Sequence, residues 1–184
     1  YRGDHRQPQH AVTPGSLTIT RVDGKPLAIA DNQENSPFSG RRIAYAKWLT
    51  SGQHPLVARV LVTRFWLHHF GHGIVQTPDA FGKLGMLPTH PKLLDWMASY
   101  FMDHSWSLKQ LHRLMMTSTA YRQSAVRNLK FDQIDTANDY YWHKSVQRLD
   151  AEIVRDRILA VSGKLDRTMF GAASGIKADD TGQI

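Results

Sequence analysis

The chain has 184 residues, of which 41% are hydrophobic, and its formal net charge at pH 7 is +7. This length suffices for the core of one domain, and the absence of cysteine excludes disulfides, thiolate metal sites and covalent haem attachment within the sequence. No run of 18 apolar residues occurs, so no membrane-spanning helix is expected, and the positive charge favours acidic partners.

Residues 1–40 are predicted to form an irregular arm and loop that belong to the same domain as the helices after them. Thr13-Pro14-Gly15-Ser16 has the composition of a turn. Leu17–Val22 alternates roughly between apolar and polar residues, which is typical of one short strand. No longer alternating segment follows, so a sheet is not expected.

Helical periodicity begins at Arg41. A first helix, capped by Ser39, should end about ten residues later. After Pro55, apolar residues recur at spacings of three and four, so a second, amphipathic helix should extend to Phe70 and end at Gly71. A long loop rich in glycine and proline then leads to the next helix.

The later helices are predicted from their start signals. Thr89 should cap a third helix, and Ser107 with Gln110 has the form of a capping box for a fourth. Asp132–Asn138 is predicted as a short helix, and Asp150 should begin the last one. Apolar residues of this last helix should line one face: Ile153, Val154, Ile158 and Val161.

The predicted fold class is mostly α, a compact multi-helix domain with at least five helices, an irregular N-terminal arm and at most one short strand pair. The predicted boundaries are 1–40 for the arm and loop, 41–166 for the helical domain and 167–184 for a mobile tail.

Charged residues within the second predicted helix and the loop after it suggest a polar pocket. Buried arginines need an acidic or carbonyl partner, and Asp79, Asp95 and Glu152 are candidates. One interpretation is a carboxylate- or phosphate-binding pocket beside Trp66, and the preferred one is an internal ion-pair network that fixes helix register. The candidate residues are Arg59, Arg64, His68, His69, Asp79, His90 and Asp95.

Two other charged patterns are interpreted as structural. One pattern is the spacing of His68, His69 and His72, which also occurs in metal sites. Gly71 should end the helix before His72, so His72 would not share a helix face with His68, and no metal site is predicted. Charges around the start of the last helix suit capping and structural ion pairs, and they comprise Arg148, Glu152, Arg155 and Asp156.

Ordered sequence blocks along most of the chain resemble one known family. They include Ala46-Lys47-Trp48-Leu49-Thr50-Ser51, Pro55-Leu56-Val57-Ala58-Arg59-Val60, His68-His69-Phe70-Gly71, Thr77-Pro78-Asp79, Pro88-Thr89-His90-Pro91, Trp106-Ser107-Leu108-Lys109, Tyr121-Arg122-Gln123-Ser124 and Arg148-Leu149-Asp150-Ala151-Glu152. The chain is similar to the C-terminal of the two planctomycete-specific domains in exported, cytochrome-c-linked proteins, a domain catalogued as being of unknown function.

This resemblance implies that the chain is a piece of a longer protein located outside the cytoplasm, in the periplasm or at the cell surface. No cofactor is expected in this piece, whereas an upstream segment could carry haem c. The implied partners are other domains of the same polypeptide, a cytochrome or an acidic molecule, and nucleic acid is the least favoured. The chain departs from the family pattern at Thr63, Leu67, His72 and Lys92, where the family usually has other polar or charged residues.

Two hypotheses on function follow. The first is a helical structural or interaction domain of a larger exported, cytochrome-c-associated protein. The alternative is an enzyme domain that acts in haem-linked redox chemistry, or on an anionic polysaccharide, through the Arg/His/Asp pocket. An enzyme should gather these side chains around one open cleft, whereas an interaction domain should engage them with one another and expose an apolar patch elsewhere.

Overall fold

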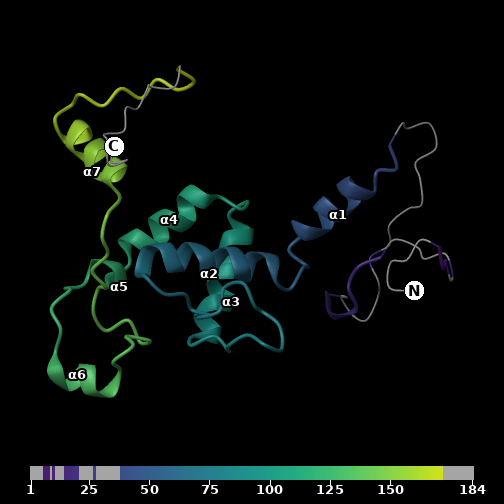
Figure 1. Ribbon diagram of the computed structural model, residues 1–184, viewed down its shortest axis with the longest axis horizontal. Helices are drawn as coiled ribbons and strands as arrows, with labels where there is room; N and C mark the ends of the chain where they lie inside the picture. Colours follow the sequence, from purple (N-terminus) through teal and green to yellow (C-terminus); the bar gives the residue numbers. More distant parts are fainter. Residues whose placement is uncertain (1–5, 9, 11–14, 21–26, 28–37, 172–184) are drawn as a thin grey trace. The chain divides into compact units, whose positions relative to one another are not determined.

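The computed structural model describes residues 6–8, 10, 15–20, 27 and 38–171 (Figure 1). The chain divides into two compact units, Tyr1–Val146 and Gln147–Ile184. The described residues contain seven α-helices and no strand, which confirms the mostly α fold class. Most of the predicted N-terminal arm and of the predicted tail lies outside the described residues.

Three helices form the core of the first unit: α2 (Val57–Phe70), α3 (Pro91–Asp103) and α4 (Leu108–Thr117). Figure 1 shows them close together, and each of the three packs against the other two. Their large apolar side chains are almost completely removed from solvent, which is the main source of stability for such a unit. The buried residues include Val62, Trp66, Phe70, Leu94, Met97, Phe101, Leu111 and Met115.

Local sequence signals set the ends of two core helices as predicted. Gly71 follows α2 with φ 92°, a left-handed conformation that favours glycine, and its N–H donates to the carbonyl of Leu67 at 2.8 Å. Ser107 precedes α4, and its hydroxyl accepts a hydrogen bond from the N–H of Gln110 at 3.4 Å.

The predicted caps of α1 and α3 were wrong. Helix α1 (Arg41–Leu49) begins after Gly40, whose φ of 69° turns the chain, and not after Ser39. Helix α3 begins after His90, with Pro91 supplying the fixed φ of its first position. The Thr89 hydroxyl instead donates to the carbonyl of Ile74 at 3.1 Å, so it joins the two ends of the 71–90 loop.

The predicted strand at Leu17–Val22 was also wrong where the structure describes it. Thr18–Thr20 is a 3₁₀ turn, η1, in which both the N–H and the hydroxyl of Thr20 donate to the carbonyl of Leu17, at 3.0 and 2.8 Å. This local bond competes with strand pairing, as threonine side chains often do.

The remaining helices are short or belong to the second unit. Helices α5 (Thr119–Arg122) and α6 (Leu129–Ile134) follow α4. Helix α6 starts three residues before the predicted segment because the side chain of Asn128 caps it by accepting from the N–H of Lys130. Helix α7 (Ala151–Val161) begins after Asp150, as predicted, although the Asp150 side chain makes no capping hydrogen bond.

Burial on α4 gives a direct test of this core. Leu111 is completely buried, so Leu111→Ala should lower the free energy of unfolding by about 2–5 kcal/mol, through lost transfer energy and a cavity. Urea titration followed by circular dichroism measures this. Met116→Ala on the same helix removes a half-exposed side chain and should cost much less, and equal costs would show that α4 does not pack as described.

Candidate functional site

An ion pair joins the first core helix to the second. The Arg59 side chain on α2 donates from Nε to Oδ1 of Asp95 on α3 at 2.7 Å, and its Nη1 donates to the carbonyl of Pro55. Both charged groups remain partly exposed, so the pair contributes at most about 1 kcal/mol to stability. Its main effect is to hold the guanidinium in one orientation.

This ion pair borders an apolar groove between α3 and the 75–91 loop, here called the α3 groove. Its volume is about 390 Å³, and its apolar walls come from Val75, Phe81, Met86, Leu87, Pro88, Pro91 and Leu94. Gly85 shapes the loop, because a Cβ at this position would lie 1.6 Å from the carbonyl oxygen of Ala80. The N–H of Gly85 also donates to the carbonyl of Gly82 at 2.9 Å, which closes the turn.

The second arginine of the predicted pocket forms a separate pair. Arg64 donates from Nη2 to Oδ1 of Asp79 at 2.9 Å, and both side chains are well exposed. His68, one turn further along α2, is exposed as well. These three residues lie at the surface and do not line the α3 groove.

A pair of histidines from two helices forms a connected polar cluster with Lys144 and Tyr121. Nε2 of His69, at the end of α2, lies 2.7 Å from Nδ1 of His112 on α4, a hydrogen bond in which one ring donates and the other accepts. Lys144 donates to the carbonyl of His69 and lies 4.0 Å from the centre of the Tyr121 ring. Sequence reasoning missed His112, Tyr121 and Lys144, because nothing local links residues so far apart.

The field within this histidine cluster is positive. Burial, followed by the nearby charges of His112, Lys144 and His68, lowers the pKa of His69 below its usual value. Burial also lowers the pKa of Lys144. Two adjacent imidazoles beside an ammonium group disfavour a further proton, so His69 is held neutral at physiological pH.

Aromatic contacts hold the other two histidines of this region. His72 stacks on Tyr141 with ring centres 4.6 Å apart, and His90 lies 5.8 Å from the same ring. Tyr141 is buried with φ 53°, a strained conformation for a non-glycine residue, and burial raises the pKa of its phenol to about 12. Asn138 steadies this turn, since its side chain bonds the backbone of His143 through both its nitrogen and its oxygen.

The predicted polar pocket therefore divides into separate places. Arg59 and Asp95 meet at the α3 groove, and Arg64 and Asp79 meet at the surface. His69 bonds His112, while Nδ1 of His90 bonds the Thr89 hydroxyl at 3.0 Å. Among the described residues, no three His, Asp or Glu side chains gather as metal ligands.

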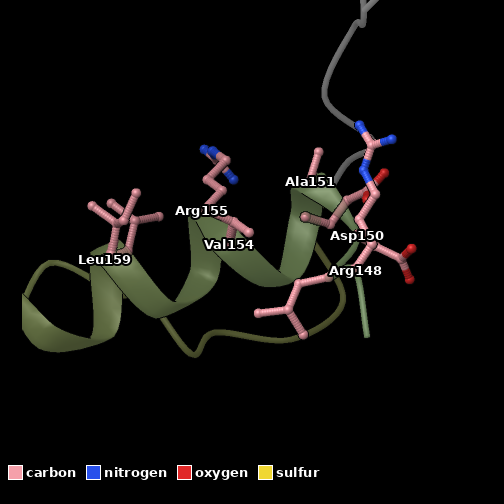
Figure 2. Close-up of a pocket in the computed structure, with 9 residues that line it drawn as sticks. Arg148, Asp150, Ala151, Val154, Arg155 and Leu159 are labelled. Atoms are coloured by element: carbon pink, nitrogen blue, oxygen red, sulfur yellow. The ribbon is translucent and has the colours of Figure 1, made fainter. Parts of the chain in front are cut away.

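The second unit carries an open hollow at the start of α7. It has a volume of about 700 Å³ and includes Leu149, Val154 and Ile158 (Figure 2). Figure 2 shows the side chains of Ala151, Arg155 and Leu159 projecting from one side of the helix.

The charged residues of α7 do not pair in the part of the chain that the structure describes. Arg148, Glu152, Arg155 and Asp156, predicted as structural ion pairs, form no ion pair there. All four side chains are exposed, and ordering two long solvated side chains costs conformational entropy that a surface contact barely offsets. The apolar face with Ile153, Val154, Ile158 and Val161 is likewise exposed.

The chain belongs to the family described as "PSD1: Protein of unknown function (DUF1553)", whose model matches residues 41–182. This match confirms the expected membership of a catalogued domain family of unknown function. No curated protein and no solved structure matches the sequence. Within the described residues, none of the helices has the length and apolar character needed to cross a membrane.

The lowered pKa of His69 predicts a pH dependence of stability. The folded state binds fewer protons than the unfolded state between the usual histidine pKa of 6.5 and the lower folded value. Stability should therefore be highest above pH 6.5 and fall as the pH drops through this window. Urea midpoints from pH 7.5 to 5.0 should show a shallower fall in His69→Asn than in the wild type.

The neighbouring variant His68→Asn is the matched control, since it removes an exposed imidazole from the same turn. It should keep most of the wild-type slope, because the charge of His68 is the smallest of the causes that lower the pKa of His69. Some slope should remain in His69→Asn, because burial also lowers the pKa of His54. Equal slopes in all three proteins would show that protonation of His69 is not linked to folding.

A buried hydroxyl on α2 gives a second prediction. Thr63 is completely buried, and its Oγ1 has no hydrogen-bond partner among the described residues. Such a hydroxyl costs about 1–3 kcal/mol. Thr63→Val, which keeps the shape, should leave the free energy of unfolding unchanged or raise it by up to about 2 kcal/mol.

Thr63→Ser provides the contrast, because it keeps the hydroxyl and removes the methyl group that packs close to Gly73. It should be less stable than the wild type in the same urea titration. A destabilised Thr63→Val would instead show that the hydroxyl is bonded in solution.

Proposed function

We propose that this chain is a helical interaction domain of a larger exported protein that is associated with a c-type cytochrome. The α3 groove is its contact site for another polypeptide segment. The observation that carries this proposal is an apolar groove with an exposed apolar rim, while most of the candidate polar residues are engaged with one another.

The size of the apolar surface supports a polypeptide as the occupant. The loop beside the groove exposes Leu84 at 96% and Leu87 at 88%, and Met86 is also exposed. This surface therefore extends beyond the groove, further than a small ligand held inside it would cover. Contiguous exposed apolar residues with a polar border are typical of protein contact sites. The Arg59–Asp95 pair supplies such a border.

The family resemblance supports another domain of the same polypeptide as the partner. Members of the resembled family combine this domain with an upstream planctomycete-specific domain and often with a haem c segment, and they are exported. An apolar segment of such an upstream domain would fill the groove. Its charged neighbours could pair with the exposed edges of Arg59 and Asp95.

The enzyme alternative has less support. It requires the seven residues of the predicted pocket to face one cavity, and of these only Arg59 and Asp95 line the α3 groove. The other five are Arg64, His68, His69, Asp79 and His90. The histidine pair could act as a base, since His69 is held neutral. However, no nucleophile or acid is paired with it in the part of the chain described by the structure.

The proposal predicts the effect of one charge placed in the groove. Leu87→Asp puts a carboxylate on the apolar wall, and burying it against the partner is unfavourable. The binding partner in this test is the rest of the same polypeptide, produced as a separate chain. In calorimetric titration, the Leu87→Asp variant should bind this partner at least about tenfold more weakly than the wild type does.

Val126→Asp is the control, because it changes a similarly exposed apolar residue of the same unit outside the groove. Its affinity should stay within about twofold of the wild type. Absence of binding by the wild type, or an equal loss in both variants, would contradict the assignment of the groove.

A further inference from the structure

A second pocket, unrelated to the α3 groove, opens between the end of α3 and α4. Its volume is about 490 Å³. Its lining consists of Tyr100 from α3 and Lys109, Gln110, Arg113, Leu114 and Thr117 from α4. None of these residues is acidic, and we call this site the basic pocket.

The two cations of the basic pocket are not neutralised by any residue that the structure describes. The side chains of Lys109 and Arg113 are exposed, and neither forms an ion pair or hydrogen bond with any described residue. Three other arginines of the same unit differ, because Arg59, Arg64 and Arg127 each pair with an aspartate, whereas Arg122 forms no ion pair with a described residue. The basic pocket therefore keeps a positive potential that pairing removes elsewhere.

The placement of these cations does not serve helix stability. Lys109 and Arg113 are four residues apart on α4, where like charges repel and cost a few tenths of a kcal/mol. No acidic residue occurs in the first turn of α4 to offset them. A ligand with negative charge would turn this repulsion into two favourable contacts.

Neutral polar groups complete the lining. The Gln110 side chain and the Tyr100 hydroxyl have no hydrogen-bond partner within the described ranges, so both are free to bind a ligand. The Thr117 hydroxyl already donates to the carbonyl of Arg113 at 2.8 Å and can still accept. Amide and hydroxyl groups beside cations match a ligand that carries both hydroxyls and anionic groups.

We propose that the basic pocket binds an acidic polysaccharide, with its sulfate or carboxylate groups on Lys109 and Arg113. The sugar hydroxyls bond to Gln110, Tyr100 and Thr117. The guanidinium of Arg113 can hold an oxyanion through two parallel hydrogen bonds, and the Lys109 ammonium adds a point charge.

The aromatic residues next to the pocket favour a polysaccharide over single-stranded nucleic acid. Nucleic-acid binding without sequence preference needs open ring faces and a row of cations along the backbone. The Tyr100 ring is stacked on His104 with centres 3.9 Å apart and lies 5.7 Å from Trp96. One face of the Tyr100 ring is therefore occupied by His104, and only two cations line the pocket.

Binding of polyanions to the full chain tests this proposal. Dextran sulfate and polygalacturonate supply sulfate and carboxylate groups, and uncharged dextran is the control ligand. Calorimetric titration at fixed salt should show binding of at least one acidic polysaccharide and none of dextran. Lys109→Gln with Arg113→Gln should lower the affinity by at least about tenfold, because two charge-assisted contacts are lost.

A charge-matched double variant separates the pocket from net charge. Arg122→Gln with Lys130→Gln removes two exposed cations of the same unit and should change the affinity by less than about threefold. Equal losses in the two double variants would overturn the proposal, as would tighter binding of oligothymidylate or polyglutamate. Leu87→Asp should leave polysaccharide binding unchanged, because Leu87 lies in the α3 groove and not in the basic pocket. The proposal for the basic pocket is therefore tested independently of the proposal for the α3 groove.

Discussion

Burial of the apolar side of α2 against α3 and α4 is the interaction on which the rest of the structure depends. Val62, Trp66 and Phe70 occupy successive turns of this helix and are nearly inaccessible to solvent. Trp66 and Phe70 stack with ring centres 3.9 Å apart, and Tyr141 packs edge-on against both rings. This packing fixes the rotation of α2 about its axis, and that rotation decides where each polar side chain of the helix points.

The polar residues of α2 consequently face different parts of the first unit. Arg59 reaches α3, Arg64 reaches the loop at Asp79, and His69 reaches α4. Each is about five residues from the next, which turns the side chain by about 140° around the helix. A single pocket cannot collect side chains distributed in this way, and this arrangement supports a structural role for most of them.

The helices that depend on local periodicity could be predicted from the sequence. The side-chain contacts between residues far apart in the chain could not. The spacing of apolar residues and the glycine at position 71 were enough to predict α2. The sequence around Thr89 resembles a cap, yet its hydroxyl bonds Ile74, fifteen residues earlier. The pairing of His69 with His112 depends on how helices meet, which spacing along the chain does not reveal. The same holds for Lys109 and Arg113, which have no acidic partner among the described residues.

Helix α3 explains how one small unit can offer two distinct surfaces. Asp95 borders the apolar groove, whereas Tyr100 lines the basic pocket. Five residues separate them, or about 140° of rotation, so the same rigid helix faces the loop with one side and α4 with another. Because buried Leu94, Met97 and Phe101 hold α3 in place between these sides, a ligand at one surface need not disturb the other. An interaction domain built this way could hold a neighbouring polypeptide and an acidic chain at the same time.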